Sequence, residues 1–184
     1  PCVERSGSIL SDLFLDYGNE RQIDMLSPLV RKSCYIRYPF HEDIFTEGEA
    51  ILYRIAQTYG FSYLDQPLVV LRDHEGNCGK AIRRNAEMTF AVLDRLEAGP
   101  DFPPECRGPL SVLRAQYWRN LGWQAIRLND DVDWARHCYL NAVRLSWRQA
   151  MHPRTLTGLG LSLLPFPARK TINRWGHRLR GHPN

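Results

Sequence analysis

Apolar side chains recur at helical spacing in four stretches after residue 79, and this periodicity constrains the fold more than any other feature of the sequence. The stretches cover residues 80–96, 110–121, 131–143 and 168–181. In the third stretch, Asp131 is placed to cap a helix. The expected inner face of that helix consists of Ala135, Cys138, Tyr139, Ala142 and Val143. We therefore expect a helical region over residues 79–164.

Residues 1–78 show a different pattern, in which helical and strand-like segments alternate. The clearest helix covers residues 46–60, where Thr46 and Glu49 form a capping box and Gly60 marks the end. Its apolar stripe consists of Ile51, Leu52, Ile55, Ala56 and Tyr59. A short helix is expected within 8–17, whereas 26–38 and 61–71 have the composition of strands. Two or three strands cannot form an independent sheet. The expected fold class is therefore α/β to mostly α, with residues 1–78 forming part of an α/β domain.

Charge is distributed unevenly along the chain. The composition is ordinary for a globular protein, with 43% hydrophobic and 24% charged residues, and the formal net charge is +4. After Asp133, however, there are nine Arg or Lys residues and no acidic residue, whereas residues 1–133 contain 15 basic and 20 acidic residues. The end of the chain, residues 165–184, is expected to be a basic amphipathic tail with Ile172, Trp175 and Leu179 on one side. Such a tail suits an anionic membrane surface; a disordered tail or an ordinary packed helix is the alternative. Nucleic acid is not expected as a partner, because no stacking platform accompanies the basic residues.

The cysteines and the first residue indicate the cellular setting. The five cysteines are widely spaced and form no Cys-x-x-Cys pair, which predicts reduced, buried thiols rather than a disulfide framework or a zinc site. The chain begins with Pro1, and no charged-then-apolar leader follows. These features predict a piece of a longer cytoplasmic protein. The apolar stretch 155–165 is too short to cross a bilayer.

Two clusters of ionisable residues are candidates for chemistry. Residues 42–49 contain four carboxylates, of which Glu49 is best placed to act as a general base, although acids also favour the first turn of a helix. Arg72 and His74 follow the apolar run 68–71, where a strand is expected to end. At such a position Arg72 can bind a phosphate, and His74 can bind a phosphate or a divalent metal. The alternative for this second cluster is a solvated turn with surface ion pairs.

Residues 118–125, WRNLGWQA, resemble the start of one tetratricopeptide unit. Ala135, Tyr139 and Ala142 match later positions of that unit if one residue is inserted. A single unit cannot bury its own apolar face. We therefore interpret these residues as a helical hairpin packed on the rest of the chain.

Several segments, taken in order, resemble the second half of the family-2 glycosyltransferases of the GT-A fold. They are Phe40-His41-Glu42, the acidic helix start and Arg within 47–54, Tyr63 followed by Pro67-Leu68, Arg72-Asp73-His74, and Ala135-Arg136 with Ala142. The resemblance extends over about residues 7–165. It implies transfer of a sugar, with inversion, from a nucleotide diphosphate sugar to a saccharide, lipid-linked or protein acceptor. The cysteines and the basic tail together predict a cytoplasmic protein, peripheral on the inner face of the membrane.

The resemblance also implies roles for individual residues. Glu49 or Glu47 would act as the base on the acceptor hydroxyl, and Arg72 and His74 would contact the diphosphate or its Mg²⁺ or Mn²⁺ ion, with His74 as a metal ligand. The Asp that usually follows the Glu of the helix motif is absent, since its place falls on Gly48 or Ala50. The only Asp-x-Asp sequence is 131–133, which we interpret as a helix cap. The chain alone is therefore expected to be inactive. The alternatives are a non-catalytic, tetratricopeptide-like interaction module and a membrane-surface adaptor that uses the basic tail.

Overall fold

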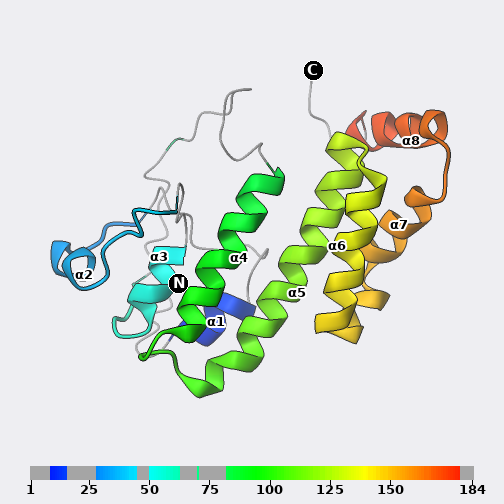
Figure 1. Ribbon diagram of the computed structural model, residues 1–184. Helices are drawn as coiled ribbons and strands as arrows, with labels where there is room; N and C mark the ends of the chain where they lie inside the picture. The colour runs from blue at the N-terminus through cyan, green and yellow to red at the C-terminus, as the bar shows by residue number, and fades with distance from the viewer. Residues whose placement is uncertain (1–8, 16–27, 45–49, 63–69, 71–81, 179–184) are drawn as a thin grey trace. The chain divides into compact units, whose positions relative to one another are not determined.

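The computed structural model describes residues 9–15, 28–44, 50–62, 70 and 82–178, with side chains up to residue 173 (Figure 1). The described residues are mostly helical and include no strand, apart from a single bridge residue at Phe61. The expectation of a mostly α chain is confirmed to this extent. The chain divides into two compact units, Pro1–Leu113 and Arg114–Asn184. The boundary expected at residue 78 lies outside the described residues and stays a prediction.

The helices are numbered as in Figure 1. The first unit contains α1 (Leu10–Leu15), α2 (Lys32–Arg37), α3 (Ala50–Ala56), α4 (Ile82–Ala98), the 3-10 turn η2 (Pro104–Cys106) and the first turns of α5 (Arg107–Gln124). The second unit contains the rest of α5, the π-helical turn η3 (Ala125–Asn129), α6 (Val132–Leu145), the 3-10 turn η4 (Trp147–Met151), α7 (Pro153–Ser162) and α8 (Phe166–Arg178). The predicted helices within 8–17, 46–60 and 80–96 correspond to α1, α3 and α4.

The core of the first unit is formed around α3. Ile51, Leu52 and Ile55 are buried, as the apolar stripe predicts. Phe14 of α1 packs its ring edge-to-face on Tyr53, with the ring centroids 5.3 Å apart. Such an arrangement places the positive edge of one ring against the negative face of the other, which adds to the gain from burial. The short helices α1 and α3 are thus stabilised by packing rather than by their own length.

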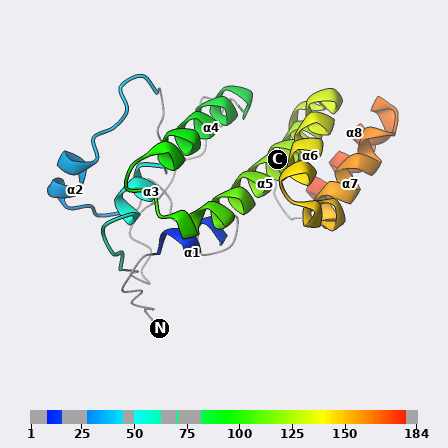
Figure 2. The same ribbon diagram turned by 60° about the horizontal axis from the view of Figure 1, so that its bottom comes forward.

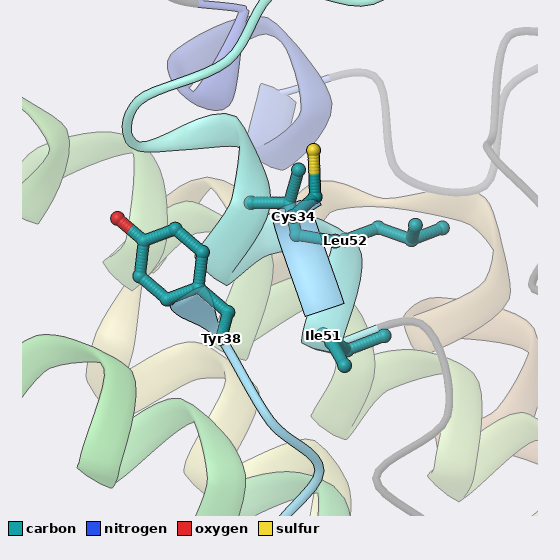
Figure 3. Close-up of a cluster of buried hydrophobic side chains, with 5 residues drawn as sticks. Cys34, Tyr38, Ile51 and Leu52 are labelled. Atoms are coloured by element: carbon teal, nitrogen blue, oxygen red, sulfur yellow. The ribbon is translucent and has the colours of Figure 1, made fainter. Parts of the chain in front are cut away.

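The strand expected within 26–38 is wrong, because the structure has helix α2 there. Cys34 and Tyr38 are four residues apart and lie on one helical face, in a buried cluster with residues of α3 (Figure 3). Ile36 lies between them in the sequence and is exposed. A strand would have placed all three on the same face, whereas a helix separates Ile36 from the other two. Of the strand-like segment 61–71, Phe61, Ser62 and Val70 are described; Val70 is exposed and outside any strand.

Tyr139 of α6 forms the centre of the second unit, in which α6 lies between the C-terminal half of α5 and α7 (Figures 1 and 2). Its buried ring contacts two glycines. A Cβ atom added to Gly122 of α5 would lie 2.9 Å from the ring, and one added to Gly158 of α7 would collide with the phenol oxygen. Neither position can accept a side chain without displacing the tyrosine. The three helices therefore approach one another closely at this ring.

Polar side chains connect the same helices. Arg119 of α5 is buried and donates to Gln149 Oε1 of η4 over 2.8 Å. Arg136 of α6 donates to the carbonyl oxygen of Ser162 at the end of α7 over 2.7 Å. The second of these bonds satisfies a carbonyl group that has no partner within its own helix.

The connection between α5 and α6 contains one residue more than an α-helical turn would. The turn η3 is π-helical, and such a turn closes its hydrogen bonds over five residues instead of four. This extra residue lies between Gly122 of α5 and Ala135 of α6. Asp130 then adopts a left-handed conformation with φ of 53°, and Asp131 caps α6 by accepting from the Trp134 amide over 3.2 Å. The predicted cap is confirmed.

Helix α8 forms within the predicted tail, residues 165–184. Ile172, which was expected on the apolar side of the tail, is 44% exposed. Arg169, which was expected on the basic side, is only 9% exposed. Arg169 is buried because its guanidinium group donates to the carboxylate of Asp130, in the turn before α6.

Candidate functional site

The four residues predicted to carry the chemistry lie outside the described residues. They are Glu47, Glu49, Arg72 and His74. The structure describes residues 38–44, which end three positions before Glu47, and helix α3, which begins directly after Glu49. The described geometry of the candidate site is therefore that of these two flanking elements.

The segment before the glutamates is attached to α3 by Arg54. Its guanidinium Nη1 donates to the carbonyl oxygen of Pro39 over 2.7 Å, and its Cζ lies 5.8 Å from the centre of the Tyr38 ring. Arg54 lies in the last turn of α3, where a cation also suits the helix dipole. Arg54 thus holds the segment around Tyr38 and Pro39 against helix α3.

Aromatic residues fix the start of the Phe-His-Glu turn. The ring of Phe40 stacks on Tyr35 of α2 with a centroid distance of 5.5 Å. The hydroxyl of Tyr38 is 2.6 Å from that of Thr58, just after α3. These contacts from α2 were not predicted, because the sequence pattern had suggested a strand there.

Asp43, one of the four clustered carboxylates, forms an ion pair with Arg95 of α4. Arg95 Nη1 donates to Asp43 Oδ1 over 2.8 Å, and Nη2 contacts the other carboxylate oxygen. These hydrogen bonds lower the pKa of Asp43 from 3.8 to about 2. A carboxylate with so low a pKa is a weak base, so Asp43 is not suited to take a proton from an acceptor hydroxyl. No local sequence signal could have revealed this pair, because 52 residues separate its members.

The Asp-x-Asp sequence at 131–133 forms the start of helix α6. Asp131 is engaged as the cap of α6, and the side chain of Asp133 is fully exposed, with the Nη1 atom of Arg136 4.0 Å from its Oδ1 atom. Within the part of the chain that the structure describes, no group of three or more His, Cys, Asp or Glu residues could hold a metal ion. The predicted metal ligand His74 lies outside that part.

The described cysteines fit the prediction of buried free thiols. Cys34, Cys106 and Cys138 are buried and not disulfide-bonded. Burial raises the pKa of the Cys106 thiol, which disfavours the reactive thiolate. These three residues therefore act as small core side chains.

No helix among the described residues combines the length and the apolar character needed to cross a bilayer. Comparisons with protein-family models, with curated proteins and with solved structures gave no match to this chain.

Proposed function

We propose that this chain is the acceptor-side part of an inverting, family-2 glycosyltransferase of the GT-A fold. The proposal rests on the order of the family-like motifs in the sequence. The structural observation that supports it is the attachment of Pro39 to Arg54, which brings the Phe40-His41-Glu42 turn to the helix that follows the glutamates. A base positioned between these two elements would be held by rigid structure on both sides.

In the proposed reaction an acceptor hydroxyl attacks the anomeric carbon of the donor sugar. The new C–O bond forms as the bond to the nucleoside diphosphate breaks, and Glu49 or Glu47 takes the hydroxyl proton. Arg72 and His74 would bind the diphosphate leaving group. A divalent Mg²⁺ or Mn²⁺ ion would neutralise the diphosphate in such enzymes. The described residues provide no ligand set for it, and the roles above do not depend on it.

The test uses the full-length product of the gene that encodes this chain. Release of nucleoside diphosphate from a panel of nucleotide sugars is measured with saccharide and lipid-linked acceptors. Replacing the base, by Glu49→Gln or Glu47→Gln, should lower kcat by about 10²–10⁴-fold, because proton transfer contributes that much. The matched control is Glu87→Gln, which changes an exposed glutamate of α4 and should leave turnover unchanged. Full turnover by both base variants would refute the assigned roles.

A non-catalytic interaction module is the second candidate. The observation that favours it is the close packing of α5, α6 and α7 around Tyr139, which resembles the helix pairing of tetratricopeptide units. If the full-length protein neither binds nucleotide sugars in calorimetry nor releases nucleoside diphosphate, this candidate replaces the enzyme.

A further inference from the structure

Two arginines of the second unit converge on one neutral oxygen atom. Arg119 of α5 donates to the amide oxygen Oδ1 of Asn120 from both Nε and Nη2, over 3.4 Å each. Arg154 of α7 donates to the same oxygen from Nη1 over 3.1 Å. An amide oxygen carries no net charge, so it neutralises neither guanidinium group. Two like charges are therefore held side by side, which costs electrostatic energy that a nearby anion would offset.

A third donor, His152, precedes α7 and lies close to both arginines. Its Nδ1 atom accepts from the backbone amide of Arg154 over 3.2 Å, so the neutral ring carries its proton on Nε2. Burial and the charges of Arg119 and Arg154 lower the pKa of His152 below its usual value. The neutral ring is thus favoured, and its Nε2–H group has no hydrogen-bond partner among the described residues. We call Arg119, Asn120, His152 and Arg154 the Arg–His cluster.

The Arg–His cluster combines a fixed cation with an accessible one. Arg119 is buried, and Gln149 of η4 holds its Nη1 atom over 2.8 Å. The side chain of Arg154 is exposed, and Asn120 is its one hydrogen-bond acceptor among the described residues. The first amide groups of α7 already donate to His152. The donors open to a ligand are therefore side chains and not the amides of the helix end.

The carboxylates of the second unit are grouped elsewhere. Residues 114–184 contain three acidic side chains, Asp130, Asp131 and Asp133, all at the start of α6. The turn η4 and His152 follow the other end of that helix, which has 14 residues and is about 21 Å long. The three aspartates have partners of their own, which are Arg169, the Trp134 amide and Arg136. Negative charge at the Arg–His cluster must therefore come from outside the second unit.

From these observations we infer that the Arg–His cluster is a binding site for a phosphate monoester group. Two permanently charged guanidinium groups match the charge of nearly −2 on such a group. Its three terminal oxygens can each accept from a different donor, namely Arg119, Arg154 and His152. A carboxylate has one charge and two oxygens and satisfies the cluster less well. The site lies within the second unit and does not depend on the proposed sugar transfer.

The first test is an NMR titration of the full chain with inorganic phosphate at constant ionic strength. Phosphate should shift the signals of the His152 ring in a saturable way and raise the pKa of His152, because a bound anion favours the charged ring. Arg154→Gln should bind phosphate at least about tenfold more weakly, since a hydrogen bond from a charged group contributes that much. The matched control is Lys170→Gln, which removes an exposed positive charge from α8 and should bind like the parent protein.

The second test adds a carboxylate instead of removing a contact. Asn120→Asp keeps the shape of the side chain and places a negative charge where both arginines donate. This variant should unfold at a higher temperature than the parent protein and bind phosphate at least about tenfold more weakly, because the cluster then contains its own anion. Phosphate should raise the melting temperature of the parent protein but not that of Asn120→Asp.

Three results would overturn the inference. They are the absence of a saturable shift at His152, equal weakening by Arg154→Gln and Lys170→Gln, and undiminished phosphate binding by Asn120→Asp. Circular dichroism of every variant checks that the helix content is unchanged.

Co-sedimentation with vesicles that contain phosphatidic acid identifies the source of the phosphate group. Sedimentation that Asn120→Asp abolishes would assign the site to a lipid headgroup. A protein that binds phosphate but stays in solution with these vesicles would have a site for a soluble phosphate ester.

Discussion

Tyr139 shows how single residues determine the packing of the second unit. Its ring occupies the space left by two glycines, and burial raises the pKa of its phenol well above the usual value. Among the described residues its hydroxyl has no hydrogen-bond partner. An unpaired buried hydroxyl carries a desolvation cost, so Tyr139 stabilises the packing here by the shape of its ring and not by a hydrogen bond of its hydroxyl group.

Gly158→Ala should destabilise the protein by about 1–3 kcal/mol or more, because the new methyl group overlaps the Tyr139 phenol in a packed core. The measurement is urea unfolding followed by circular dichroism. Gly160→Ala is a matched control on the same helix, since a Cβ atom there meets no atom within 4 Å. It should stabilise by about 0.5–1 kcal/mol through the higher helix propensity of alanine. Equal effects of the two substitutions would contradict the described packing.

Asp43 provides a test by pH. Hydrogen bonds from Arg95 lower its pKa to about 2, so an NMR titration of its carboxyl group should have a midpoint near that value. Because the folded-state pKa lies below the unfolded one, any stability from this pair is present above about pH 4 and is lost as the pH falls through the folded pKa. Arg95→Gln should return the midpoint toward 3.8, whereas Arg148→Gln in the other unit should not move it. An unchanged midpoint in Arg95→Gln would exclude the ion pair as the cause.

Elements are held in place by two different means in this chain. Helix α3 is fixed by burial of apolar side chains. Helix α8 is fixed by the Asp130–Arg169 ion pair and a few hydrogen bonds. Loss of one polar contact should therefore affect α8 far more than loss of one methyl group would affect α3. Asp130 is the residue on which this difference can be measured.

Asp130→Asn should loosen α8 while leaving the turn intact, because asparagine also tolerates a positive φ. Hydrogen bonds to charged groups contribute about 1.5–3 kcal/mol each, so amides in residues 166–173 should exchange at least about tenfold faster. Hydrogen–deuterium exchange followed by mass spectrometry measures this directly. Asp133→Asn is the control, since the side chain of Asp133 is fully exposed. Unchanged exchange in α8 would show that the Asp130–Arg169 ion pair does not stabilise this helix.

Sequence periodicity predicted the long helices well and missed one of the short helices. Helices α4 and α6 span 17 and 14 residues, which gives the apolar pattern several turns to repeat. Helix α2 has six residues, and the sequence of Cys34, Ile36 and Tyr38 alternates as a strand would. The side chains of α3 decide which of the two patterns is used. Tertiary contacts of this kind cannot be read from a short segment.

At the scale of the whole molecule, sequence predicted charge better than it predicted polar contacts. The division into an acidic body and a basic end follows from counting residues. The pairs Asp43–Arg95 and Asp130–Arg169 join residues 52 and 39 positions apart, and either arginine could equally have been assigned to a solvated face. For the candidate site, the sequence predicted the glutamates and the Arg72–His74 cluster. The structure added the residues that hold the segment before the glutamates, which are Arg54, Tyr35 and Arg95.

The π-helical turn η3 has a consequence for how this chain can change in length during evolution. A π turn arises when one residue is inserted into a helix, and it can be lost by deleting one residue without cutting the helices on either side. Such a deletion would also alter the turn that places Asp130, the left-handed residue that binds Arg169. Homologous chains that are one residue shorter between positions 122 and 135 should therefore also have replaced the arginine at position 169. Covariation between a gap and a distant basic residue would be the signature of this turn.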